Sequence, residues 1–396
     1  MITKVGNPMK KALAILPFTA LAFVPTCSAV DVFKDDKNVF QIGGYIDARV
    51  IDTQGVTEVV NGSSRINFAF TRDMSNDWTT YAKLEWGVNP FGNSTIAYSS
   101  ESNFETKSGD FLNNRLGYVG LSHDAYGSIT IGKQWGAWYD VVYNTNYGFV
   151  WDGNASGTYT YNKSDGAING VGRGDKVIQY RNGFGDFSMA IQMQLKNSVS
   201  DIEDDGSNSP NRLVMTEYDN TYGIGLTYEA TEMLTLTAGG NFGEPEGTTA
   251  SGVVISETDY IYGVGASWGN WDSYGFYVAA NVNANEFHDT DNIGRFLQEA
   301  IGLESIASYL FDNNVKILAS YNILEAGDKY EAAHPGDVFK RQFAFAGVHY
   351  IWDNSVIFYL EGRVDFSDFS SSTPGLEARQ ALTEDDGIAV GVRYTL

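Results

Sequence analysis

Residues 260–282, YIYGVGASWGNWDSYGFYVAANV, contain two alternating runs joined by a short turn. Apolar or aromatic residues occupy every second position of both runs, and most positions between them are small or polar. Because side chains point alternately to the two faces of a strand, each run predicts a strand with one apolar face. These faces comprise Tyr260, Tyr262, Val264, Ala266 and Trp268, then Tyr274, Phe276, Val278, Ala280 and Val282.

Similar runs recur along the chain, and the connections between them alternate between short and long. Turn-forming residues make seven short connections, at 73–77, 123–127, 182–186, 230–232, 269–271, 312–314 and 353–354. Eight long connections are centred near Thr57, Asn93, Tyr147, Asp205, Gly247, Asp291, Ala332 and Gly375. This rhythm predicts an all-β fold, a sixteen-stranded antiparallel transmembrane β-barrel with short turns at one rim and long loops at the other.

The first residues have the pattern of a secretory signal peptide. Met9-Lys10-Lys11 is basic, residues 12–24 are apolar, and Cys27-Ser28-Ala29 is a small-residue cleavage site. We therefore expect a signal peptide at 1–29 and one barrel domain at 30–396. The single cysteine lies in this leader, so the mature chain has no disulfide, and a lipoprotein role for Cys27 is the alternative.

Acidic residues outnumber basic ones. The leader holds three lysines and no acids, so residues 30–396 carry 23 basic against 49 acidic side chains, a net charge of −26. This charge argues against nucleic acid as a partner. The acids cluster in loops such as 201–205 and 384–386, where they are either plain solvated charge or bridge divalent cations to anionic lipopolysaccharide.

The last ten residues, GIAVGVRYTL at 387–396, form another alternating run. Their apolar end, Leu396, resembles the C-terminal signal that the barrel-assembly machinery reads, although Phe is usual there. Tyr and Trp near strand ends favour the aromatic girdles of a membrane barrel over a soluble β-sandwich. We therefore expect a multi-pass protein of the Gram-negative outer membrane, in contact with lipid and lipopolysaccharide.

Charged residues avoid the lipid face of a membrane barrel, so strand parity assigns several of them to the lumen. Arg65 faces inward if Ile66 and Phe68 face lipid. Leu116 and Tyr118 are placed outward, which turns Arg115 inward. The same alternation directs inward Tyr45, Asp47, Arg49, Asn67, Tyr81, Lys83, Glu85, Arg173, Asp175, Gln179 and Arg181.

Residues 114–121, NRLGYVGL, and 127–134, GSITIGKQ, with Tyr139-Asp140 after them and Arg173 before 180–182, resemble the trimeric general diffusion porins of Gram-negative bacteria. In that family the third loop folds into the barrel, and its acids face a basic cluster on the wall. The resemblance implies a pore constriction made by Arg65, Arg115, Arg173, Lys133, Glu85, Asp140 and Asp152. Tyr45 and Asn146 depart from the pattern, because a wall lysine and a loop acid are expected there.

The resemblance also implies a homotrimer, in which the second loop, with Glu101 and Glu105, latches over the neighbouring subunit. It predicts an outer-membrane porin, a water-filled channel for passive diffusion of small hydrophilic solutes and ions, without enzymatic activity, metal or cofactor. Acidic loops at the mouth predict weak cation selectivity, opposed by the wall arginines.

Three other hypotheses stay open. Trp135, Trp138 and Trp151 in the third loop could form a track for sugar faces, which would make the channel oligosaccharide-selective; the alternative is that they pack the loop against the wall. Residues 265–269 match GxSxG, yet no helix follows to form the nucleophile elbow of a hydrolase. Residues 201–206 imitate half of a calcium loop, but Arg212 replaces its final glutamate.

Overall fold

The computed structural model describes residues 29–396 except 100–110, 162, 201–209, 211 and 354. The predicted leader, Glu101, Glu105 and the calcium-like segment lie outside these residues. Sixteen long strands form a closed barrel. They are β2 (Asn38–Thr53), β4 (Arg65–Asp73), β5 (Trp78–Val88), β6 (Leu112–His123), β7 (Gly127–Trp135), β8 (Arg173–Phe184), β9 (Phe187–Gln194), β11 (Leu213–Glu229), β12 (Leu234–Thr249), β14 (Asp259–Trp268), β15 (Gly275–Glu286), β16 (Ala300–Leu310), β17 (Val315–Ala326), β18 (Lys340–Asp353), β19 (Val356–Asp365) and β20 (Gly387–Thr395).

Each long strand pairs antiparallel with its neighbours, and β20 pairs with β2 from Tyr45–Thr395 to Thr53–Gly387. Closure leaves the barrel without an open edge, so the backbone groups of its strands bond to one another and not to lipid. The predicted sixteen-stranded antiparallel barrel is confirmed. The described chain also has short strands at the rims, β1 (Val30–Lys34), β3 (Val56–Asn61), β10 (Asn197–Ser200) and β13 (Val254–Ser256).

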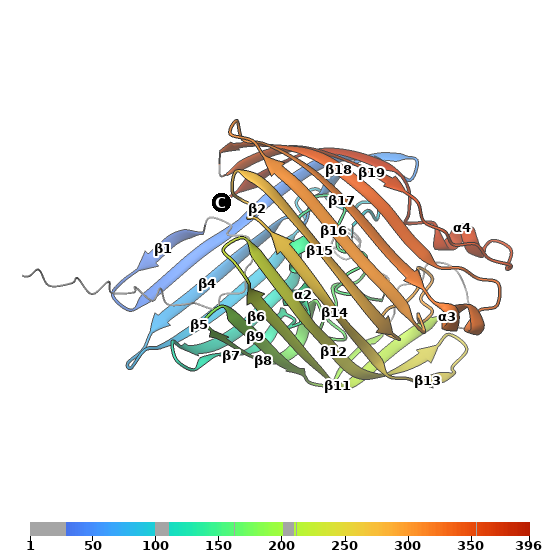
Figure 1. Cartoon of the computed structure of the whole chain (residues 1–396), viewed down its shortest axis with the longest axis horizontal. Helices are drawn as coiled ribbons and strands as arrows, with labels where there is room; N and C mark the ends of the chain where they lie inside the picture. Colours follow the sequence, from blue (N-terminus) through green and yellow to red (C-terminus); the bar gives the residue numbers. More distant parts are fainter. Residues whose placement is uncertain (1–28, 100–110, 162, 201–209, 211, 354) are drawn as a thin grey trace, which may run out of the picture.

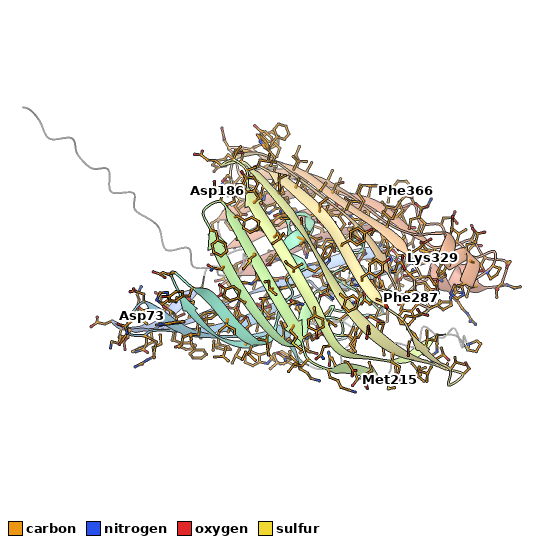
Figure 2. The ribbon with its side chains drawn as sticks, turned by 60° about the horizontal axis from the view of Figure 1, so that its bottom comes forward. Asp73, Asp186, Met215, Phe287, Lys329 and Phe366 are labelled. Carbon is orange, nitrogen blue, oxygen red and sulfur yellow. The ribbon has the colours of Figure 1, made fainter. Side chains whose placement is uncertain are left out.

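The two rims differ as the alternation predicted. Figure 1 shows β1 and the C-terminus toward one rim, and helices α3 (Asp328–Ala333) and α4 (Leu376–Gln380) at the other. Figure 2 places Asp73 and Asp186 toward the turn rim, and Lys329 and Phe366 toward the loop rim. Two positions predicted as loop centres, Thr57 and Gly247, lie instead in β3 and β12, because hairpins continue the ladder there.

The outer face of the barrel is apolar. Tyr262 and Phe276 are more than half exposed on β14 and β15, whereas the alternate residues Ile261 and Tyr277 are buried inside. The outward apolar faces predicted for these strands, and for β9 and β20, are confirmed. None of the described helices is long and apolar enough to cross a membrane.

The predicted parity is wrong at one place in β6. Leu116 is buried in an interior cluster with Trp135 and Tyr159, although it was placed outward. The register between β5 and β6 shifts between Glu85 and Trp86. Such a β-bulge adds one residue to a strand, so Arg115 and Leu116 both face the lumen. Tyr118, which follows at period two, is also turned inward.

The main apolar cluster lies inside the barrel. Trp151 and Val150 of the third loop pack there against Phe343, Phe345 and Tyr359 of the wall. The described interior is therefore partly filled by a packed loop, and any passage runs beside that loop.

On an outer face in contact with lipid, the free-energy cost of a charged side chain depends on its position along the strand. Val264 lies mid-strand in β14, and Val254 lies in β13 at the loop rim, with 53% and 55% exposure. We expect Val264→Arg to lower the free energy of unfolding in lipid vesicles by about 2–4 kcal/mol. Val254→Arg should change it by less than about 1 kcal/mol. Equal effects in urea titrations would show that β14 does not cross the bilayer.

Candidate functional site

The third long connection, residues 136–172, folds into the barrel and follows its inner wall. It contains α2 (Tyr139–Val142) and the 3-10 helix η1 (Tyr143–Thr145), and Figure 1 shows α2 enclosed by strands. α2 contacts β11, β12 and β14, and η1 contacts β15 and β16. The loop therefore lies against β11 to β16, on the side of the lumen away from β4 to β6.

Glycines on the inner faces of the wall make room for this loop. A Cβ atom at Gly225 of β11 would lie 2.3 Å from the carbonyl oxygen of Ala137. One at Gly302 of β16 would lie 2.0 Å from the carbonyl oxygen of Ala155. No side chain fits at such distances, so loop and wall meet backbone to backbone.

Glu304 of β16 fixes the loop near its middle. This buried carboxylate accepts hydrogen bonds from the N–H groups of Ala155 and Ser156, both at 2.9 Å. The hydroxyl of Thr145 donates to its other oxygen at 2.8 Å. Buried amides must find acceptors, and a charged acceptor makes the stronger bond. One wall residue thus anchors two turns of the loop.

Glu361 of β19 anchors a second segment in the same way. Its two oxygens accept hydrogen bonds from the N–H groups of Phe149 and Val150, each at 2.9 Å. His349 Nε2 lies 2.8 Å from the same carboxylate, and Arg49 donates to the carbonyl oxygen of Phe149 at 2.6 Å. At Phe149 both the N–H and the carbonyl oxygen of the loop backbone are therefore hydrogen-bonded to the wall.

His288, just beyond β15, holds a third point. Its Nε2 lies 2.9 Å from the carbonyl oxygen of Gly157, and its Nδ1 lies 2.6 Å from Asp259 Oδ1. Tyr218 donates to the other oxygen of Asp259 at 2.6 Å. A carbonyl oxygen only accepts, so the pair of bonds suits a doubly protonated ring. Burial alone would lower the pKa of His288, but Asp259 outweighs it and the pKa is raised.

Lys163 ties the loop to the external connection before β20. Its Nζ lies 2.5 Å from Glu384, whose carboxylate also contacts Arg341 and Arg363. Burial opposes ionisation of Glu384, but Lys163, Arg363 and Arg341 outweigh it and lower its pKa to about 2. An external loop and the inserted loop therefore share one buried ionic cluster.

Arg65, Arg115 and Glu85 meet on the wall, where the resemblance placed them. Arg115 Nε lies 3.0 Å from Glu85 Oε1, and Arg65 Nη1 lies 3.9 Å from the same oxygen. Arg115 is 0% exposed, whereas 12% of the Arg65 side chain is exposed. Part of the Arg65 side chain is thus open to the lumen, whereas Arg115 is fully buried where it pairs with Glu85.

Lys133 and Arg173 gather around Asp165, a loop residue that the sequence did not single out. Lys133 Nζ lies 3.1 Å from Asp165 and 2.9 Å from Asp175, and Arg173 Nε lies 3.6 Å from Asp165. Arg173 is fully buried, with its guanidinium 5.6 Å from the ring centre of Trp135. The loop covers Arg173 here, and the part that the resemblance implies for it in the constriction stays a prediction.

The two predicted loop acids have different surroundings. Asp140 forms an ion pair with Arg181 of β8, and both side chains are partly exposed. Asp152 is partly buried beside Trp151. Asp140 therefore meets a wall cation, but one outside the set of arginines that the resemblance named.

The three loop tryptophans pack. Trp138 and Trp151 are 0% exposed, and Trp138 Nε1 donates to the carbonyl oxygen of Ser156 at 2.9 Å. Trp135 is covered by Tyr139, with ring centres 3.9 Å apart. Trp138 and Trp151 therefore offer no open ring face here on which a sugar could stack, and a sugar track in the loop stays a prediction.

The loop divides the lumen into a covered and an open arc. Mid-strand residues of β14 to β19 such as Ile261, Asn281 and Leu318 are buried beneath it. On the other arc, partly exposed side chains line a space that we call the passage. Its residues are Arg65, Tyr81, Lys83, Tyr118, Arg181 and Arg393 on the wall, and Tyr139, Tyr143, Asn146, Tyr147 and Phe149 on the loop.

Two observations in the described part of the chain concern metal binding and the GxSxG segment. No group of three or more His, Cys, Asp or Glu side chains among these residues could hold a metal ion. The GxSxG segment at 265–269 runs along β14 into a turn, and Ser267 is buried.

A closed antiparallel barrel with an apolar outer face, short turns at one rim and a loop folded inside defines a β-barrel membrane channel. Residues 17–396 match the family model described as Gram-negative porin, so the chain belongs to that family and is an outer-membrane porin.

Its relatives and structural neighbours agree. It is 23% identical to outer membrane protein Omp-EA of Erwinia amylovora, over 98% of this chain and all of that one. OmpF of Salmonella typhi, solved in complex with daunomycin, superposes with a TM-score of 0.66 at 20% identity, over 92% of this chain and 99% of that one. The trimer form of OmpT of Vibrio cholerae gives 0.60 at 14% identity, over 91% and 100%.

The His288 clamp predicts a pH dependence. A raised folded-state pKa means that its stabilisation is complete below the ordinary pKa of 6.5 and is lost as pH rises through the raised value. We expect the Tm of the barrel in detergent to fall over this window. His288→Gln should lower the free energy of unfolding at about pH 6 by about 1–3 kcal/mol and flatten the pH profile. The control is His123→Gln at the turn rim; equal flattening in both variants would contradict the clamp.

Proposed function

We propose that solutes cross this porin through the passage, between the inserted loop and the wall formed by β4 to β8. The observation that carries the proposal is the exposure pattern, because partly exposed interior side chains gather on that arc while the loop covers the other. Water reaches these side chains, so small hydrophilic solutes and ions diffuse passively along them. The chain acts as a channel and not as an enzyme; its family supports this.

The residues that we propose for the constriction differ from those that the resemblance implied. Arg65 keeps its place, and Lys83, Arg181 and Arg393 join it as exposed wall cations. Arg115, Arg173, Lys133, Glu85 and Asp140 hold the loop and the wall cations in position, and Asp152 stays a predicted member of the constriction.

This membership changes the expected selectivity. The acidic external loops predicted weak cation selectivity, but they lie at the mouth, where salt screens charges over roughly 8 Å. In the passage, Glu85 is bound by Arg115 and Asp140 by Arg181, which leaves the wall cations in excess. We therefore propose that the passage favours anions.

We also propose the partners that the barrel surface requires. The apolar outer face binds outer-membrane lipid, and acidic external loops bind lipopolysaccharide through divalent cations. The alternating strand β20 presents the C-terminal signal to the barrel-assembly machinery. A homotrimer is supported by the trimer form of a structural neighbour. Removal of residues 1–29 as a signal peptide belongs to the same proposal.

Reversal potentials in planar bilayers test the passage. At about 8 Å in water one unit charge acts on a passing ion with about 0.5 kcal/mol, and Lys83→Glu changes the charge by two. The cation gains about what the anion loses, so we expect this variant to raise the cation-to-anion permeability ratio about thirtyfold. Lys37→Glu, at the turn rim, is the control and should change it little. An unchanged ratio in Lys83→Glu, or a wild type that conducts no ions, would refute the proposal.

A further inference from the structure

The loop side of the passage is aromatic. Tyr139 and Tyr143 are four residues apart across α2 and η1, so they lie on one helical face. The Tyr139 ring is backed by Trp135 at 3.9 Å between ring centres, and the Tyr147 ring by Trp271 at 4.4 Å. All three tyrosines are partly exposed, and Tyr139 and Tyr147 each have one ring face held by packing. Rigid aromatic faces therefore border the water.

The wall side of the passage is cationic. Arg65, Lys83, Arg181 and Arg393 come from four different strands and stay partly exposed. The acids beside them are engaged: Glu85 by Arg115, Asp140 by Arg181, and Asp47, which is fully buried, by Arg49 and Arg393. Glu229 ends β11, and it and Asp140 interact electrostatically with Tyr143.

Two contacts show that these sides bound one space. Arg181 of the wall pairs with Asp140 of the loop, and the guanidinium of Arg393 lies 3.7 Å from the ring centre of Phe149. Lys83 and Arg65 on the wall, and Tyr143 and Asn146 on the loop, are partly exposed as well. Aromatic groups of the loop and cationic groups of the wall therefore border the same passage.

We propose that the passage transiently binds anionic solutes that carry a flat ring, with aromatic carboxylates as the class. The carboxylate is drawn to the wall cations while the ring stacks on the loop tyrosines. A neutral sugar gains no attraction from the cations, and an aromatic cation is repelled by them. This inference rests on the proposed passage and adds the solute that it selects.

Block of the ionic current by three probes tests the solute class. Benzoate has the charge and the ring, cyclohexanecarboxylate has the same charge without an aromatic face, and benzylamine has the ring with the opposite charge. Benzoate should block wild-type channels at a concentration roughly threefold to tenfold lower than cyclohexanecarboxylate, the worth of one stacking contact. Benzylamine should block least.

Two variants with matched controls assign the groups. Tyr143→Leu keeps an apolar side chain but removes the aromatic face, and should raise the half-blocking concentration of benzoate roughly threefold to tenfold without changing that of cyclohexanecarboxylate. Tyr222→Leu, on the outer face, is its control. Lys83→Gln should weaken block by both carboxylates, and Lys37→Gln at the rim should not.

The outcomes separate this inference from the proposed passage. Equal block by benzoate and cyclohexanecarboxylate overturns the solute class while the channel still conducts. A Tyr143→Leu channel that conducts with unchanged benzoate block overturns the tyrosine face. If Tyr143→Leu does not fold, the wild-type comparison and Lys83→Gln decide alone. A wild type that conducts no ions refutes the passage itself.

Discussion

A loop placed inside a membrane barrel brings its backbone amides with it, and each must find a partner away from bulk water. This constraint organises the interior. Buried carboxylates of the wall, Glu304 and Glu361, each accept two successive loop amides, and His288 takes a loop carbonyl oxygen. Such bonds repay the cost of burying charge only because each carboxylate is nearly saturated. The path of the loop is thus dictated by where the wall offers acceptors.

The position of the passage follows from that path. Anchors on β14 to β19 hold the loop to one side, so water remains on the other. The arginines that motif matching named were expected to face solutes, yet Arg115 and Arg173 are sealed behind the loop and the bulge. They form ion pairs with Glu85 and Asp165 within the interior. The resemblance assigned Arg115 and Arg173 to solute contact. In this structure they hold the loop and the wall in position.

The fold was readable because strand alternation is a local property. Period-two patterning and the rhythm of turns need no knowledge of distant residues, and they predicted the strand number, closure and outward faces. The bulge in β6 was not readable, since one extra residue leaves no mark on composition and reverses parity at Leu116 and Tyr118. The anchors were half readable: Glu304 and Glu361 are lone acids at inward positions. Their partners lie more than a hundred residues away, so only the structure shows what they bind.

The glycines of the inner wall have a further consequence. At Gly225 and Gly302 the strand carries no side chain inward, so bare peptide groups line the barrel beneath the loop. At these two positions the loop occupies the space that inward side chains would otherwise fill. The number of strands sets the outer diameter of this barrel. The width of its opening is set by the inserted loop, which is not part of the sheet. A change in the length of this loop would therefore change the width of the opening without any change in the strands.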